Sequence, residues 1–160
     1  MRLIVFSDTH GRCSMLPQCV RRTGPDMIVH LGDHMRDTRI IEESFPEIPL
    51  YAVPGNCDFS SAEDTLTFSA GGVLVFATHG HRYGVKSTVD SLLNSAHFAG
   101  AQLVLYGHTH IARIDYPAGM TVVNPGSSGL GSEPSFAQID IREGGIAAKI
   151  LPVVPKDPYM

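Results

Sequence analysis

Short apolar runs alternate with polar turns along the first two thirds of the chain. Runs of this length without internal alternation are typical of strands that are buried on both faces. They predict strands at Leu3–Phe6, Met27–Leu31, Leu50–Val53, Thr65–Ala70, Val73–Ala77 and Leu103–Tyr106. Because only Gly71-Gly72 separates the fourth strand from the fifth, these two are expected to form a hairpin.

Three segments between or after these strands have helical signals. They are Met15–Arg22, Thr38–Ser44 and Val85–Phe98. The last carries apolar residues three and four positions apart, and Gly100 predicts where it ends. Glycine or proline follows each of the other two, as expected at the end of a helix.

The pattern changes in the last third of the chain, where strand signals follow one another with only turns between them. These strands are expected at Ile111–Tyr116, Met120–Val123, Ser135–Ile141 and Ile146–Val154. Strand and helix thus alternate in the first half, and strands dominate the second. We infer an α/β fold of two packed sheets with helices covering the outer faces.

Length and composition predict one globular domain that spans residues 1–160. The chain is 43% hydrophobic, which is enough for a core, and no repeat or linker divides it. No apolar run approaches the roughly 20 residues of a membrane helix, so no membrane association is expected. Met1–Phe6 has no cleavage site after it and is interpreted as a strand rather than a secretion signal.

Charge and cysteine content narrow the class of protein further. Twelve basic residues against 16 acidic residues leave a net charge of −4, so no stable nucleic-acid partner is expected. Cys13, Cys19 and Cys57 are an odd number without a motif, which favours reduced thiols and a cytoplasmic location.

Five predicted strands end in side chains that can bind a metal ion. The residues are Asp8 and His10, Asp33, Asn56, His79, and His108 and His110. Ligands of α/β sheets collect beyond the carboxyl ends of the strands, so the seven side chains are expected in one crevice. Residues two apart in an extended chain point to the same side, which would aim each of the two spaced pairs into it.

Glycines accompany these residues at positions 32, 55, 80 and 107, where close approach of the backbone is expected. Taken singly, each candidate ligand is equally well explained as a polar residue that caps a turn. As an ordered set, four imidazoles, two carboxylates and one amide favour Mn²⁺, Fe, Ni²⁺, Co²⁺ or Zn²⁺. Seven ligands exceed the needs of one tetrahedral zinc ion and fit two ions that share a carboxylate.

Five short motifs occur in the order of the calcineurin-like metallophosphoesterase signature. They are Asp8-Thr9-His10, Gly32-Asp33, Gly55-Asn56, His79-Gly80-His81 and Gly107-His108-Thr109-His110. The chain resembles the small single-domain, YfcE-like phosphodiesterases of that superfamily, whose Asn124-Pro125-Gly126-Ser127 motif it also carries. The resemblance implies a four-layer α-β-β-α sandwich of two mixed sheets, in agreement with the pattern of strands and helices.

The resemblance also implies how the ligands are divided. Asp8, His10 and His110 would hold one divalent ion, Asn56, His79 and His108 the other, and Asp33 would bridge the two. Manganese is the ion most expected. The implied activity is dinuclear metal-dependent hydrolysis of a small phosphate ester, mainly a diester, and nucleotides are among the substrates that the resemblance allows. A hydroxide that bridges the ions would attack phosphorus.

One segment departs from the family pattern. Many catalytic members have histidine after the metal-binding asparagine and use it to protonate the leaving group, whereas this chain has Cys57. Since a thiol is a poor proton donor to an alkoxide, Asp58 and His81 are the nearest substitutes. The expected catalytic residues are therefore Asp33, Asp58 and His81, and the expected substrate contacts are Asn56, Cys57 and His81. His81 is equally well explained as part of a turn.

Other residues have plainer explanations. His30 lies in an apolar run and is expected to be a hydrogen-bonded core histidine, whereas His34 could face the site or belong to a loop. Phe59, Tyr83 and Tyr106 could line the site, but packing in the core is the role we expect for them.

Two other functions compete with the hydrolase. One is a non-catalytic scaffold like the retromer subunit of the same fold, in which the metal site is degraded. The seven candidate ligands present here argue against it. The other is a nuclease, for which this acidic chain has no additional DNA-binding element. The chain could be a monomer or a homo-oligomer that associates through exposed strands or the tail Val153–Met160.

Overall fold

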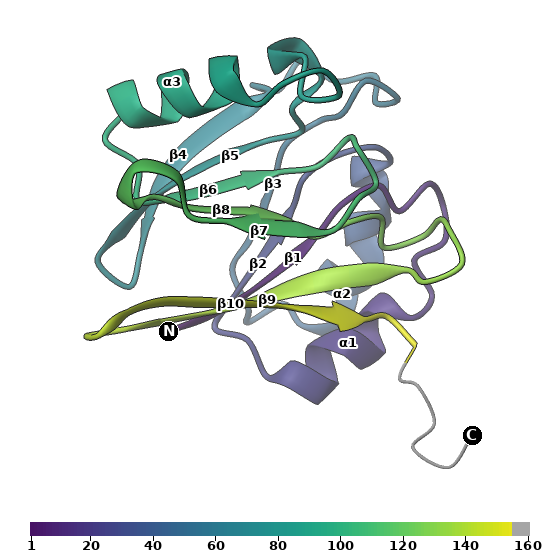
Figure 1. Cartoon of the computed structure of the whole chain (residues 1–160). Helices are drawn as coiled ribbons and strands as arrows, with labels where there is room; N and C mark the ends of the chain where they lie inside the picture. Colours follow the sequence, from purple (N-terminus) through teal and green to yellow (C-terminus); the bar gives the residue numbers. More distant parts are fainter. Residues whose placement is uncertain (155–160) are drawn as a thin grey trace.

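Two sheets pack face to face, and helices cover their outer faces (Figure 1). The structure is a computed structural model and describes residues 1–154. Helices α1 (Leu16–Thr23) and α2 (Arg39–Ser44) lie on one outer face, and α3 (Asp90–Phe98) lies on the other. This arrangement confirms the predicted α-β-β-α sandwich. Most of the tail proposed above as an oligomer contact lies outside the described residues.

The first sheet has the order β10-β9-β1-β2-β3. Its strands are β1 (Arg2–Phe6), β2 (Met27–His30), β3 (Leu50–Ala52), β9 (Ser135–Arg142) and β10 (Gly145–Pro152). Strands β1, β2 and β3 are parallel, whereas β9 runs antiparallel to both of its neighbours. The carboxyl ends of the three parallel strands therefore meet at one edge of the sheet.

The second sheet has the order β4-β5-β6-β8-β7. Its strands are β4 (Thr65–Ala70), β5 (Val73–Thr78), β6 (Leu103–Tyr106), β7 (Arg113–Asp115) and β8 (Thr121–Asn124). Here β5, β6 and β8 are parallel, and β4 pairs with β5 as the predicted hairpin. Each sheet thus contributes a set of parallel strand ends.

Short 3-10 turns complete the described secondary structure: η1 (Met35–Thr38), η2 (His81–Tyr83) and η3 (Pro117–Gly119). The predicted helix Val85–Phe98 is wrong in its first part, because α3 begins only at Asp90. The amides of Ser87 and Thr88 instead bond the carbonyl of Gly84 and form a turn. Val85 is nevertheless buried against α3 and its sheet, so its apolar character reflects core packing rather than helix.

The predicted strand Ile111–Tyr116 is also too long, since only Arg113–Asp115 pairs with β8 at the edge of the sheet. Ile111 stands 68% exposed before it. This strand and the other predicted strands all agree with the structure to within about two residues at each end, the usual uncertainty of such boundaries.

The first strand shows how the layers are held together. Leu3 and Val5 face the second sheet, whereas Ile4 and Phe6 face the helix layer, as the two-residue period of a strand requires. All four side chains are fully buried, and the burial of each stabilises the fold by about 2 kcal/mol or more. Apolar packing on both faces therefore holds β1 between the second sheet and the helix layer. No helix of residues 1–154 is both long and apolar enough to cross a membrane.

Candidate metal centre

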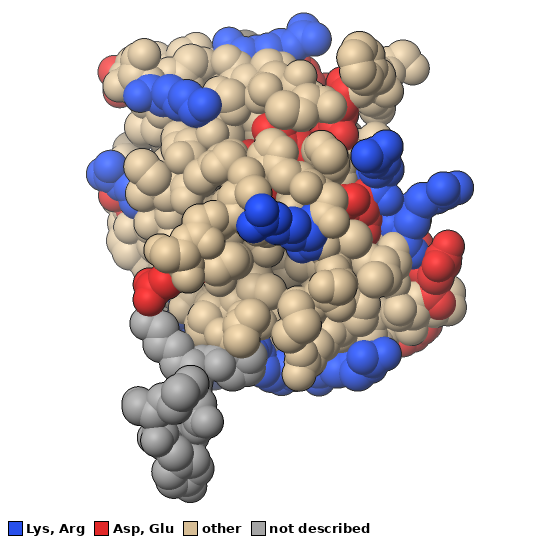
Figure 2. Space-filling model, turned by 90° about the vertical axis from the view of Figure 1, so that its right-hand side faces the viewer, with Lys and Arg blue, Asp and Glu red and all other residues tan. Residues whose placement is uncertain are grey.

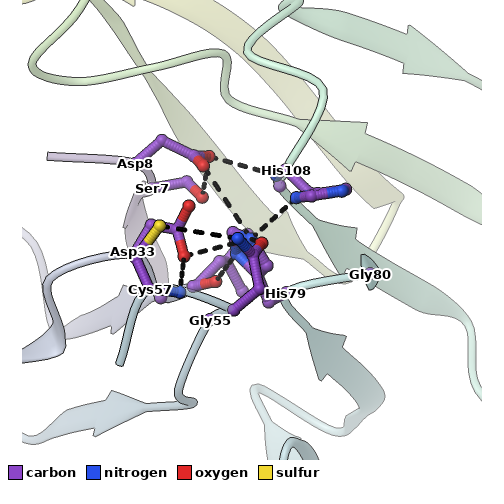
Figure 3. A network of polar contacts seen from close by, with 12 residues as sticks. Ser7, Asp8, Asp33, Gly55, Cys57, His79, Gly80 and His108 are labelled. Carbon is purple, nitrogen blue, oxygen red and sulfur yellow. Dashed lines mark hydrogen bonds and ion pairs between the residues drawn. The ribbon is translucent and has the colours of Figure 1, made fainter. Parts of the chain in front are cut away.

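The loops that follow β1, β2, β3, β5 and β6 come together at one edge of the sandwich, on the right of Figure 1. Figure 3 shows Asp8, Asp33, His79 and His108 pointing toward a common centre there. The two sheets contribute jointly, since the two aspartates follow strands of the first sheet and the two histidines follow strands of the second. The structure therefore brings together side chains that are as far apart in the sequence as Asp8 and His110.

A first group of potential ligands consists of Asp8, His10, Asp33 and His110. One ligand atom of each lies within 4.8 Å of the others. The Nε2 atom of His110 is 3.1 Å from Oδ1 of Asp8, and Nε2 of His10 is 3.6 Å from Oδ2 of Asp33. These distances suit side chains that surround a single cation.

A second group consists of Asp33, His79 and His108, whose ligand atoms also lie within 4.8 Å of one another. The Nε2 atom of His79 is 3.1 Å from Nδ1 of His108 and 3.5 Å from Oδ1 of Asp33. It is also 3.1 Å from Oδ1 of Asn56, which adds the amide to this group. All seven candidate ligands therefore meet, and Asp33 belongs to both groups.

Two buried atoms of the first group test whether this donor set fits cations. Oδ1 of Asp8 and Nε2 of His10 are buried and, apart from the ion-pair contacts with His110 and Asp33 given above, form no hydrogen bond with any described residue. A buried polar atom without a partner costs about 1–3 kcal/mol or more, and a charged one costs most. A cation between the two atoms would remove that cost. Imidazoles with carboxylates also suit first-row divalent ions, so the residues fit the metals that the sequence predicts.

The backbone presents His79 in the form that a metal requires. Its Nδ1 is 2.7 Å from the carbonyl oxygen of Leu31, and only a protonated nitrogen can donate to that oxygen. In the neutral ring, Nε2 then keeps its lone pair and faces the centre. A second hydrogen bond of this kind commonly orients histidines that bind metals.

Asp8 is held with one oxygen directed inward. Its Oδ2 accepts hydrogen bonds from the Ser7 hydroxyl at 2.5 Å and from the His108 amide at 3.1 Å. The Ser127 hydroxyl donates to its backbone carbonyl at 2.7 Å. Sequence reasoning missed Ser7, although a polar residue at the end of a buried strand, directly before a ligand, could have indicated it.

Left-handed backbone concentrates at the centre. Of the seven non-glycine residues with positive φ in the described chain, six lie here: Asp8, His10, Asp33, His34, His108 and His110. The expectation that extended backbone aligns the two spaced pairs is therefore wrong. Both pairs lie beyond the last residue of their strand, and tight turns bring their side chains together. Each such residue costs about 1 kcal/mol or more, and such strain is typical of functional sites.

Two glycines confirm the predicted close approach of the backbone. A Cβ atom at Gly55 would overlap the Asp33 carboxylate and amide, and one at Gly107 would overlap the Ser7 hydroxyl. Neither glycine is needed for its φ angle, because both adopt negative values. They are needed because the ligand loops touch one another.

Charges in the centre are arranged for metal binding near neutral pH. Burial would raise the pKa of Asp33, but the Cys57 amide and the nearby His79 outweigh it and hold that pKa below its ordinary value. Burial and His79 lower the pKa of His108 to about 4. The ionised carboxylate and the neutral imidazole are the forms that bind cations. On the face that carries these loops, Figure 2 shows acidic and basic side chains interspersed.

The three remaining predicted site residues differ in their hydrogen bonds and in their exposure. Both oxygens of Asp58 accept backbone hydrogen bonds of 2.9 Å, one from Met35 and one from Gly55. The Cys57 thiol is exposed, and partial desolvation and the Asp33 charge raise its pKa, which keeps it protonated. The His81 ring lies 5.4 Å from that of His79, and its Nδ1 has no hydrogen-bond partner among residues 1–154. His81 and Asp58 both line a pocket of about 260 Å³ beside Asn56.

Behind the ligands, a fully buried polar layer supports the loops. His30 accepts the Gly32 amide at Nδ1 and lies 3.2 Å from the Thr9 hydroxyl at Nε2, which confirms the predicted core histidine. Burial lowers its pKa to about 4. Asn124 donates to the Gly107 carbonyl and to the Thr109 hydroxyl, both at 3.0 Å. The Asn-Pro-Gly-Ser turn thus forms the floor of the centre.

The aromatic residues expected in the core have different positions. Tyr106 is buried as predicted, and Tyr83 packs edge-on against Phe76 with ring centroids 6.1 Å apart. For Phe59 the prediction is wrong, because its side chain is fully exposed on the loop after β3. An apolar residue type alone does not reveal that a loop carries it away from the sheets.

Comparison with known proteins identifies related chains. The sequence profile described as "Calcineurin-like phosphoesterase superfamily domain" matches residues 1–144. The "Probable metallophosphoesterase YsnB" of Bacillus subtilis is 35% identical over 131 residues, which are 79% of this chain and 75% of that protein.

Solved structures share the fold. A predicted phosphoesterase from Streptococcus pneumoniae superposes with a TM-score of 0.80 at 26% identity, over 95% of this chain and 89% of that one. A structure described as a novel archaeal phosphodiesterase has a TM-score of 0.75 at 21% identity, with coverages of 94% and 100%. Vps29 of Entamoeba histolytica, solved with Zn²⁺, has a TM-score of 0.74 at 17% identity, with coverages of 96% and 100%. The last two similarities concern the fold alone.

Proposed function

Because the chain belongs to the calcineurin-like phosphoesterase superfamily, we propose that it hydrolyses phosphodiesters with two divalent cations held by the seven converging side chains. The observation that carries this proposal is the position of Asp33, which belongs to both ligand groups. A carboxylate with one oxygen toward each group is suited to bridge two ions. Asp8, His10 and His110 would hold the first ion, and Asn56, His79 and His108 the second.

When bound, the cations would lower the pKa of water and offset charge on the phosphate. The protein's own residues keep the ligands in place. Leu31 orients His79 through its carbonyl, and Ser7 and the His108 amide hold Asp8. Asp58 joins the loops after β2 and β3, so we assign it a positioning role. His81, which lines the smaller pocket together with Asn56, is the better candidate to contact the ester or its leaving group.

Two pockets favour a diester over a monoester. They flank the loop after β3 and have volumes of about 400 Å³ and 260 Å³. Cys57 and Phe59 line the larger, Asn56 and His81 line the smaller, and Asp58 lines both. A phosphodiester has two substituents that could fill two pockets, whereas a monoester has one.

The test is a metal-reconstituted assay of the full chain with bis(p-nitrophenyl) phosphate and p-nitrophenyl phosphate. We expect turnover only with added divalent metal, highest with Mn²⁺, and a higher kcat/KM for the diester. Metal analysis should find two ions per chain. Binding of a single ion would contradict the dinuclear proposal, and a preference for the monoester would contradict the diester assignment.

A second candidate function is a protein-binding scaffold, which the similarity to Vps29 favours. A metal-loaded chain that turns over neither ester would support it. One domain over residues 1–160, a cytoplasmic location and a monomeric or homo-oligomeric state stay predictions.

A further inference from the structure

The larger of the two pockets beside the metal centre is a groove to which no particular substituent of the ester has been assigned so far. It lies between the loops that follow β2 and β3, and His34, Arg36, Cys57 and Phe59 are among its lining residues. Its volume of about 400 Å³ falls within the roughly 300–1,000 Å³ of small-molecule sites. A bound molecule would therefore have room for more than a phosphate group.

The groove is continuous with the centre through shared residues. The Cys57 amide donates to Asp33 at 2.9 Å while Cys57 also lines the groove. On the opposite wall, the ring of His34 lies 5.4 Å from that of His10. An ester bound at the centre could thus extend one substituent into the groove.

Phe59 is the unusual feature of this groove. Its side chain is 109% exposed, which is the exposure of an isolated residue, and no ring contact to it exists among residues 1–154. A single exposed apolar residue needs no explanation by itself. This one, however, lines a groove beside a candidate active centre, where an aromatic face is suited to stack on a planar group.

Polar groups near the ring indicate what kind of planar group would bind. Arg36 is exposed on η1, and its guanidinium has no ion pair within the described part of the chain. It can pair with an anionic oxygen or with the edge of a base. Ser60 and the Asp58 carboxylate also line the groove and can bond hydroxyl or amino groups. An aromatic face, a cation and hydrogen-bonding groups together match a nucleoside better than an alkyl or simple aryl group.

We propose that the groove binds the nucleoside of a nucleotide phosphodiester, with the base stacked on Phe59 and Arg36 in contact with its polar atoms. This inference rests on the proposed function, because it places the phosphate of the same ester at the metal centre. The inference assigns substrate selection to the loop after β3, in which Asn56 is the only candidate metal ligand.

The experiment compares two diesters with the same leaving group, thymidine 5′-(p-nitrophenyl phosphate) and methyl p-nitrophenyl phosphate. The Mn²⁺-loaded wild type should have the higher kcat/KM for the thymidine ester. Phe59→Leu should lower that value about tenfold, the loss expected for one base–aromatic stack, and should change the methyl ester less than about twofold. Phe59→Trp should retain the preference, since it keeps an aromatic face.

Matched controls come from the same chain. Phe98 at the end of α3 is 95% exposed, so it serves as a control phenylalanine outside the groove. Phe98→Leu should change kcat/KM for neither ester. Arg36→Gln should reduce hydrolysis of the thymidine ester severalfold, whereas Arg39→Gln, an exposed arginine on α2, should not.

The outcomes separate this inference from the proposed function. If the wild type cleaves neither ester, the proposed function fails, and calorimetry with thymidine 5′-monophosphate still tests the groove through the same Phe59 variants. If both esters are cleaved and Phe59→Leu affects them equally or not at all, the groove assignment is overturned. Phenyl p-nitrophenyl phosphate is a further probe, because it has an aromatic ring but no nucleoside. If it is hydrolysed as well as the thymidine ester and depends on Phe59 to the same extent, the nucleoside assignment is overturned.

Discussion

The space between the two sheets and the base of the crevice at their carboxyl ends are both buried but built in opposite ways. Between the sheets, side chains such as Leu3, Leu105 and Ile139 are apolar and sit on regular strands. In the crevice, Asp8 and His79 are just as inaccessible, yet they are polar and close to backbone in left-handed conformations. The first region stabilises the fold through apolar burial, whereas the second contains buried polar atoms, Oδ1 of Asp8 and Nε2 of His10, that lack hydrogen-bond partners among residues 1–154. Burial therefore involves apolar side chains in the first region and polar side chains in the second.

The largest expected effect follows from changing the residue common to both ligand groups. Asp33→Asn removes the charge that faces both groups, so turnover of a phosphodiester should fall by about a thousandfold or more. Bound metal should fall below one ion per chain in elemental analysis. Asp140→Asn is the control, because that carboxylate pairs with Arg2 on the first sheet, away from the centre. A Asp33→Asn variant with most of its activity and both ions would contradict the bridging role.

Two equally buried residues should respond differently to truncation or loss of charge. Leu105→Ala leaves a cavity between the sheets and should lower the free energy of unfolding by about 3 kcal/mol, with unchanged metal stoichiometry. Asp8→Asn in metal-free protein should lower it by less than about 1 kcal/mol or raise it, because the variant removes a buried charge without a full set of partners. Urea unfolding of the metal-free variants measures both. A large loss from Asp8→Asn would show that the crevice stabilises the apo fold.

The polar layer behind the ligands should make stability depend on pH. His30 has a folded-state pKa of about 4, below the ordinary value of 6.5, so the unfolded chain binds its proton more readily. Stability from the neutral ring is therefore complete above pH 6.5 and decreases as the pH falls toward 4. Between about pH 7 and pH 4.5 the loss from this group should be about 2.5 kcal/mol. Urea unfolding at pH 7 and pH 4.5 measures this loss. Between these two values, the free energy of unfolding of the metal-free wild type should fall by about 2.5 kcal/mol more than that of His30→Gln. An equal dependence on pH in both proteins would contradict the prediction.

Sequence patterns predicted the crevice better than they predicted its geometry. The seven candidate ligands could be found because apolar strands such as Leu103–Tyr106 end visibly where polar residues begin, and parallel ends must meet. The left-handed backbone at Asp8 and His108 could not be foreseen, since tertiary packing imposes it on residues that do not favour it. The start of α3 was misplaced for a related reason. Val85 has the spacing of a helix but is buried from a turn.

The smallest expected effect follows from substituting a residue that supports a ligand without binding the metal itself. Ser7→Ala removes the 2.5 Å hydrogen bond to Asp8 and frees the carboxylate to rotate, while every ligand remains. Metal affinity measured by calorimetry should fall about tenfold, the lower end of the range for outer contacts of metal ligands. Ser135→Ala is the matched control, because that buried hydroxyl donates to the Pro125 carbonyl and touches no ligand.

Both serine variants should lose about 1 kcal/mol of stability, so only the metal affinity distinguishes them. If Ser7→Ala binds metal as tightly as Ser135→Ala, the backbone turn at Asp8 and the His108 amide must suffice to orient the carboxylate. The crevice would then be organised by its backbone conformation, and the contrast with the apolar region would rest on conformational strain more than on hydrogen bonds between side chains.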